Sequence, residues 1–107
     1  MALRLFVCRT DQVPPGEMRA FPVEGVDVPV LVINIDGTFH ATTSMCPHED
    51  VSLADGYREG CKIVCPGHAY EFDFTTGACS HDRELVLRRY PITIVKGELF
   101  VDLVDGR

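Results

Sequence analysis

Short apolar segments, each bounded by turn residues, follow one another along most of the chain. Residues 3–8 and 18–23 predict the first two strands, joined by a connection with two adjacent prolines, which fix φ and remove backbone donors. Residues 30–35 are rich in β-branched residues and predict a third strand. The Asp-Gly pair at 36–37 is the strongest hairpin signal in the sequence, so we expect residues 38–43 to return beside that strand.

The second half of the chain continues this pattern in shorter pieces. Residues 49–60 are expected to form a loop, with a helical turn around 51–54, and residues 61–65 a short strand. In residues 69–74, aromatic side chains alternate with acidic ones, as in a strand with one buried face. Residues 75–77 predict a turn that makes a hairpin with the strands around it.

The last strands are predicted at residues 85–87, 90–95 and 98–104, with the final two joined by a turn at Lys96-Gly97. A long helical periodicity is absent from the sequence. Many short strands with regular turns indicate an all-β sandwich or small barrel. At 107 residues, the chain has the length of one domain.

Composition and charge narrow the classes of partner and the compartment. Sixteen acidic and ten basic residues give a net charge of −6, which disfavours nucleic acid and anionic membranes. The longest apolar run is far shorter than a membrane span, and the first residues read as a strand rather than a secretion signal. Five cysteines are an odd number for a disulfide framework, so we expect a cytoplasmic protein whose thiols are free or metal-bound.

Two short stretches, Cys46-Pro47-His48 and Cys65-Pro66-Gly67-His68, concentrate the metal-binding chemistry of the sequence. Each contributes one thiol and one imidazole, and sixteen residues separate the two pairs. Three interpretations fit these side chains: unrelated loop residues, a structural Cys2His2 zinc site, or a [2Fe–2S] cluster with two Cys and two His ligands. Zinc fingers usually place two Cys on one element and two His on another, so the mixed pairing is not typical of them.

The two pairs, followed by Tyr70-Glu71-Phe72-Asp73 and then Thr76-Gly77, resemble the Rieske iron–sulfur family along the whole chain. The resemblance implies an all-β Rieske fold of antiparallel sheets, in which a cluster-binding subdomain of two loops at about residues 43–82 is inserted in a basal β domain. It implies one [2Fe–2S] cluster per chain. The inner iron would be held by Cys46 and Cys65, and the outer iron by His48 and His68.

The ligand set also sets an expectation for the reduction potential. Two ferric ions, two sulfides and two thiolates sum to zero charge, so reduction is easier than for a cluster with four thiolates. Respiratory-complex Rieske proteins carry an extra Cys in each cluster loop and hydroxyl groups directed at the cluster. This chain lacks those Cys, and Phe72 has no hydroxyl. We therefore expect a potential toward the bottom of the Rieske range, about −150 mV.

The short chain leaves room for a carrier and not for an enzyme. Rieske oxygenases add a domain with non-haem iron, for which this chain has neither the length nor the histidines. The sequence resembles the ferredoxin components of bacterial ring-hydroxylating dioxygenase systems, and the chain as a whole looks like the ferredoxin of a carbazole-type dioxygenase. Such a monomeric carrier would take electrons from an NAD(P)H-dependent flavin reductase and pass them to a terminal Rieske non-haem iron oxygenase of aromatic compound degradation, docking near His48 and His68. The alternatives are the ferredoxin of a diiron aromatic monooxygenase and a zinc-stabilised, non-redox interaction module.

The remaining chemistry-bearing residues have simpler expectations. Cys8 and Cys61 are expected in the core and Cys79 at the surface, while His40 is expected to be half-buried in a strand and His81 to lie in a surface loop. Acidic residues gather around the ligand loops and are either an ordinary solvated face or a rim that docks a basic partner. This acidic rim consists of Glu49, Asp50, Asp55, Glu59 and Glu71.

Overall fold

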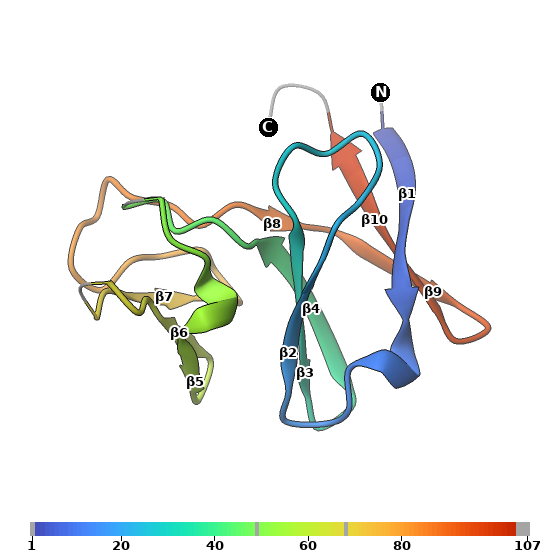
Figure 1. Cartoon of the computed structure of the whole chain (residues 1–107), viewed down its shortest axis with the longest axis horizontal. Helices are drawn as coiled ribbons and strands as arrows, with labels where there is room; N and C mark the ends of the chain where they lie inside the picture. Colours follow the sequence, from blue (N-terminus) through green and yellow to red (C-terminus); the bar gives the residue numbers. More distant parts are fainter. Residues whose placement is uncertain (1, 49, 68, 105–107) are drawn as a thin grey trace.

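The computed structural model describes residues 2–48, 50–67 and 69–104 of the chain (Figure 1). Within these residues the strands are β1 (Ala2–Arg9), β2 (Met18–Phe21), β3 (Val30–Ile35), β4 (Thr38–Thr43), β5 (Tyr57–Glu59), β6 (Lys62–Val64), β7 (Glu71–Asp73), β8 (Arg89–Tyr90), β9 (Ile92–Val95) and β10 (Glu98–Val104). Two short 3-10 helices, η1 (Thr10–Gln12) and η2 (Leu53–Asp55), complete the described elements. No described helix is long and apolar enough to cross a membrane. The predicted all-β class is confirmed.

The strands form three antiparallel sheets, with the orders β1-β10-β9, β2-β3-β4-β8 and β5-β6-β7. The third sheet and the loops around it lie to one side of the other two sheets (Figure 1). Strand β8 pairs with β4, although the whole third sheet intervenes between them in the sequence. The chain therefore leaves the second sheet after β4, forms the third sheet, and returns to the second sheet at β8.

Two two-residue hairpin turns lie where the sequence predicts them. Asp36 and Gly37 join β3 to β4 with φ values of 51° and 92°, and Lys96 and Gly97 join β9 to β10 with 49° and 78°. Positive φ at both central residues is the type I′ geometry that follows the twist of the flanking strands. The side chain of Asn34 adds a brace, because its Oδ1 accepts a 2.7 Å bond from the Gly37 N–H.

Three predicted features differ from the structure. Residues 57–59, expected in a loop, form β5 beside β6. The strand expected at 85–87 is reduced to an isolated bridge between Val86 and Ala78. The strand expected at 90–95 is divided at Pro91, which lacks the N–H needed to continue a ladder, so β8 and β9 join different sheets.

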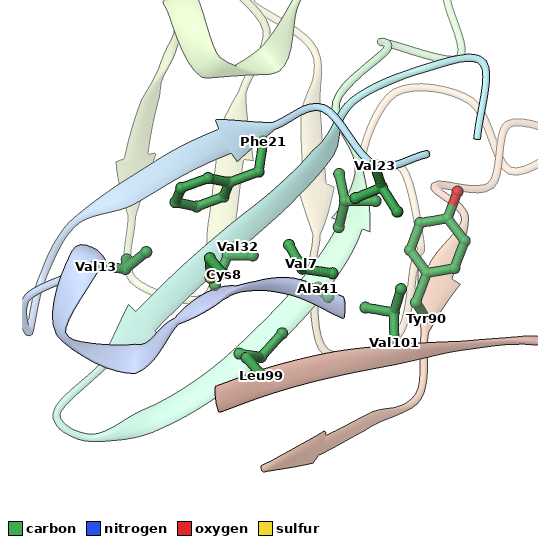
Figure 2. Packing of buried hydrophobic residues seen from close by; sticks show 11 residues of the cluster. Val7, Cys8, Val13, Phe21, Val23, Val32, Ala41, Tyr90, Leu99 and Val101 are labelled. Carbon is green, nitrogen blue, oxygen red and sulfur yellow. The ribbon is translucent and has the colours of Figure 1, made fainter. Parts of the chain in front are cut away.

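Strand β3 divides the interior into two cores. Its side chains alternate, so that Val30 and Val32 pack into the first core and Leu31 and Ile33 into the second. The first core lies between the first two sheets, where Phe21, Tyr90 and aliphatic side chains of β1, β3 and β10 meet (Figure 2). The fully buried or nearly buried members of the second core are Leu31, Ile33, Cys46, Leu53, Ile63, Cys65, Phe72, Phe74, Cys79 and Leu87.

Candidate metal centre

The first ligand loop leaves the second sheet at the end of β4. Its base is fixed on both sides, because Ser44 N–H donates to Pro29 O at 3.0 Å and Leu53 N–H donates to Ser44 O at 2.7 Å. Cys46 N–H then donates to Val51 O at 3.0 Å and closes the loop. The Cys46 side chain is only 3% exposed, whereas His48, two residues farther along, is half-buried.

The second ligand loop follows β6 and repeats this closure. Cys65 N–H donates to Tyr70 O at 2.8 Å, again to the carbonyl five residues ahead. Ala69 N–H donates back to Cys65 O at 3.1 Å, and Ala69 has a φ of 60°. Cys65 is 1% exposed and lies with Cys46 in the second core. The two loops thus present matching backbone frames, each starting at a buried cysteine.

The donors in these loops suit an iron–sulfur cluster. Two buried thiols with an imidazole nearer solvent match a cluster whose inner iron takes thiolates and whose outer iron takes histidines. His68, the fourth expected ligand, and Glu49 of the acidic rim lie outside the described residues. Among the residues that are described, no group of three or more His, Cys, Asp or Glu side chains is placed to hold a metal ion.

Tyr70 connects the two ligand loops through its ring. It stacks on His48 with ring centroids 4.1 Å apart and an interplanar angle of 27°. It also stacks on His81, with ring centroids 4.8 Å apart and an interplanar angle of 8°. The expected exposure of His81 is confirmed, but the sequence gives no signal that its ring would lie against Tyr70. This three-ring stack is the part of the site that sequence reasoning missed.

Gly56 sets how closely η2 approaches the second loop. A Cβ at this position would lie 2.0 Å from Val64 O and 3.2 Å from Pro66 Cδ. Its φ of −89° is open to any residue, so glycine is required by space alone. Val64 immediately precedes Cys65, so a side chain at position 56 would displace the backbone next to the second thiol.

Asp73 organises the turn behind the second loop. Its Oδ1 accepts hydrogen bonds from Thr75 N–H at 2.8 Å and from Thr75 Oγ1 at 2.5 Å. Its backbone O accepts from Gly77 N–H at 2.6 Å. The Thr75 hydroxyl bond lowers the pKa of Asp73, and the Thr75 and Thr76 amides and Lys62 act in the same direction against partial burial. The motif tail Phe72-Asp73…Thr76-Gly77 is thus a turn that supports the site.

The structure corrects two of the cysteine predictions. Cys61 is exposed, because it lies in the turn before β6 rather than in the strand itself. Cys79 is buried, because its backbone bridges to Phe72 and its side chain enters the second core. Neither forms a disulfide. Cys8 is buried as expected, and burial raises its pKa to about 11 despite the opposing charge of Arg19.

His40 also meets its prediction. It is half-buried in β4, and its ring lies 5.1 Å from that of Phe74. Burial, followed by the nearby charge of Arg89, lowers the pKa of His40. The residue is part of the packing between β4 and the segment that follows β7.

Most of the described acidic rim is solvent-exposed. Asp50, Asp55 and Glu59 are exposed, whereas Glu71 is half-buried and lies 3.5 Å from Lys62 Nζ. An ion pair of this kind near the surface contributes little to stability. It does reduce the net negative charge that Glu71 presents beside the second loop.

Comparisons with known proteins place this geometry in a family. Residues 4–91 match the family model described as the Rieske [2Fe-2S] domain. The ferredoxin component of the p-cumate 2,3-dioxygenase system of Pseudomonas putida is 37% identical over 100 residues, covering 91% of this chain and 83% of that protein. The ferredoxin component of the alkene monooxygenase system of Xanthobacter autotrophicus is 30% identical over 96 residues, covering 89% and 77%.

Solved structures agree with these relatives. The ferredoxin of Sphingomonas yanoikuyae B1 superposes with a TM-score of 0.86 at 33% identity, covering 95% of this chain and 100% of that one. A ferredoxin from a complex of reduced oxygenase and oxidized ferredoxin in carbazole 1,9a-dioxygenase gives a TM-score of 0.81 at 30% identity, with 92% and 91% covered. The likeness spans both cores of the chain.

Proposed function

The chain belongs to the Rieske [2Fe–2S] family, and from this premise we infer that it is a one-electron carrier of a multicomponent oxygenase system. The observation that carries the inference is that relatives matching nearly the whole chain are ferredoxin components. The family gives the cofactor as a Rieske-type [2Fe–2S] cluster. When bound, the cluster accepts and releases a single electron.

The ligands assigned to this cluster are Cys46 and Cys65 for the inner iron and His48 and His68 for the outer iron. The burial of both cysteines supports the inner assignment, because the core keeps water away from the thiolates. The partial exposure of His48 supports the outer assignment, because that ring is within reach of a docked protein. The zinc-module alternative is set aside, since the family binds an iron–sulfur cluster.

The partners are a flavin-dependent reductase that supplies the electron and a terminal oxygenase that receives it. The carbazole 1,9a-dioxygenase ferredoxin is known in complex with its oxygenase, which supports docking of the same kind here, near His48 and His68. The carrier acts in the cytoplasm as a monomer, a state that suits diffusion between two partners.

Residues 43–82 act as a cluster-binding subdomain inserted in the basal β domain. The pairing of β4 with β8 on either side of the insertion supports this division. Leu85 and Leu87 also pack in or against the second core, which favours a C-terminal boundary nearer residue 88.

A second function, as the ferredoxin of a monooxygenase, is favoured by the alkene monooxygenase relative. Turnover assays with a Rieske dioxygenase and with a diiron monooxygenase, each supplied with the same reductase, separate the two. Faster product formation with the dioxygenase is expected, and the opposite ranking would favour the second function.

The cluster itself is tested on the purified holoprotein. We expect a brown to red colour, a low average g in the reduced electron paramagnetic resonance spectrum, and a midpoint potential of about −150 mV. A potential well above zero would contradict the low-potential assignment.

Replacing the ligand imidazole in His48→Cys adds negative charge and should lower the potential or lose the cluster. An unchanged potential would refute the role of His48 as a ligand.

Docking through the acidic rim is tested by salt and by charge removal. Asp50→Asn should slow electron transfer to a basic partner and flatten its salt dependence, since exposed charges are screened within about 8–10 Å. The matched control is Asp36→Asn, an exposed acid in the turn at the opposite end of β4 from the first loop. Equal effects of the two variants, or rates that ignore salt, would exclude a rim-directed encounter.

A further inference from the structure

The three-ring stack has an order that suggests a purpose. His48 comes from the first ligand loop, Tyr70 from the end of the second, and His81 from the connection that follows β7. Tyr70 lies in the middle and is half-buried, whereas His81 is exposed on the outside. The imidazole of His48, the proposed outer-iron ligand, is thereby covered on one face by Tyr70, and Tyr70 in turn stacks on His81.

The outer ring is held by bonds of its own. Ser80 N–H donates to Glu71 O at 2.9 Å, which ties the connection to β7 directly beside Tyr70. His81 Nδ1 lies 2.8 Å from Ser80 Oγ, so the imidazole has a hydrogen-bond partner that limits its rotation. The bridge between Ala78 and Val86 closes the base of the connection. His81 is therefore placed against Tyr70 by backbone structure and not only by the contact between the rings.

We propose that Tyr70 is a positioning residue for His48, and that His81 is the outer clamp that keeps Tyr70 in place. A histidine side chain can turn about its ring bond, and this torsion is broad and weakly restrained by itself. Stacking between two neighbouring rings restricts it, and the covered face of His48 is also shielded from water. The proposal rests on the proposed role of His48 as an outer-iron ligand, because the orientation of its ring then affects the iron.

The proposal assigns the effect to the ring of Tyr70 and not to its hydroxyl. A hydroxyl directed at a cluster would stabilise its reduced form, so loss of the hydroxyl would lower the potential. For stacking on His48, the ring of phenylalanine is equivalent to that of tyrosine. Tyr70→Phe and Tyr70→Leu therefore separate the two roles, since the first removes only the hydroxyl and the second removes the aromatic face.

The experiment compares four variants of the holoprotein: Tyr70→Phe, Tyr70→Leu, His81→Phe and His81→Ala. The readouts are the g-values and line widths of the reduced protein, the midpoint potential, and the rate of cluster loss at a fixed elevated temperature. His81 is exposed, so its variants keep the test available if Tyr70→Leu fails to fold.

We expect Tyr70→Phe and His81→Phe to match the native protein in all three readouts. Tyr70→Leu should broaden the spectrum, shift its g-values and speed cluster loss about two- to tenfold, the factor that one stacked aromatic pair provides. His81→Ala should shift the same quantities in the same direction by less. Native spectra and cluster-loss rates in both Tyr70→Leu and His81→Ala would overturn the proposal, as would equal effects of Tyr70→Phe and Tyr70→Leu.

Failure of the proposed function has a different outcome. If the native protein itself lacks the spectrum of a Rieske cluster, the ligand assignment fails before any variant is compared. A native Rieske spectrum together with unaffected Tyr70→Leu and His81→Ala proteins leaves the carrier function intact and removes only the positioning role.

Discussion

The two cores on opposite faces of β3 are built in different ways. The first is enclosed by long strands, with eight residues in β1 and seven in β10, which pair with each other along their length. The second lies between β3 and the short strands β6 and β7, of three residues each, and includes both ligand loops. Both contain fully buried side chains, but only the first is framed mainly by strand ladders.

This difference shows how the chain separates stability from chemistry. Long strands give the first core many regular backbone hydrogen bonds. They leave no loop in which a ligand thiol could be placed. In the second core the backbone is satisfied by turns, bridges and side-chain caps, which allows Cys46 and Cys65 to enter from two separate loops. With the ligands proposed above, a bound cluster would join those loops, because a metal centre couples its binding energy to the order of its ligands.

The largest expected effect comes from breaking this cross-link. Cys65→Ser should abolish cluster binding, and amide hydrogen exchange should then rise by orders of magnitude in β6 and β7 while β1 and β10 keep their protection. The matched control is Cys8→Ser, a buried thiol of the first core. Cluster retention in that variant is expected. Equal loss of protection in β1 and β6 on cluster removal would show that the two cores behave as one unit.

The next effect compares one substitution in both cores. Leu31 in the second core and Leu99 in the first are each 0% exposed. Leu→Ala at either site should lower the free energy of unfolding by about 2–5 kcal/mol, because each change leaves a cavity. Only Leu31→Ala is expected to speed cluster loss as well, measured by the decay of visible absorption. If Leu99→Ala speeds it equally, the cluster depends on global stability and not on its own core.

A third effect tests the close approach of η2 to the second loop. Gly56→Ala should force Val64 to shift and cost about 1–3 kcal/mol, the range for overpacking, with faster cluster loss. The control is Gly60→Asn, because a Cβ there meets nothing within 4 Å and asparagine tolerates its φ of 61°. Urea unfolding of the two holoproteins measures the difference. A Gly56→Ala protein as stable as Gly60→Asn would mean that the loop adapts without cost.

The contrast between the cores also explains what the sequence could predict. Strands β3, β4 and β10 match their predicted bounds, because β-branched runs and two-residue turns act locally. In the second core, β5 was missed, since three residues are too few to show a period. Burial of Cys61 and Cys79 was predicted the wrong way round, because their exposure depends on where a turn ends and a bridge begins.

The candidate ligands stand out in the sequence, whereas their surroundings do not. Residue type and spacing single out Cys46 and Cys65 as candidate ligands, and the structure buries both of them; their role at the inner iron, which the family resemblance implies, stays a prediction. The stack of Tyr70 between His48 and His81 joins three loops that are distant in sequence. No local pattern encodes such a contact. The need for glycine at position 56 is equally absent from any local sequence pattern, because it follows from the position of Val64 O.

The smallest expected effect concerns the acid limit of the second core. The pKa of Asp73 is lowered mainly by its bond from the Thr75 hydroxyl. A folded-state pKa below the unfolded value, which is about 3.9, stabilises the protein above that pH. The contribution is lost as the pH falls through the lower, folded-state pKa.

Asp73→Asn should therefore cost about 1 kcal/mol at pH 7, the worth of one such hydrogen bond, and its deficit against the native protein should shrink below about pH 4. Urea unfolding of both proteins between pH 7 and pH 3 measures this, with the exposed Asp27→Asn as a control that should show no such convergence. A deficit that stays constant with pH would mean that Asp73 acts through shape and not through charge. A deficit that grows in acid would reverse the sign assigned to its pKa shift. Because the turn lies behind the second loop only, Asp73→Asn should retain the cluster. The hydrogen exchange of β1 and β10 should be the same in the variant and the native protein.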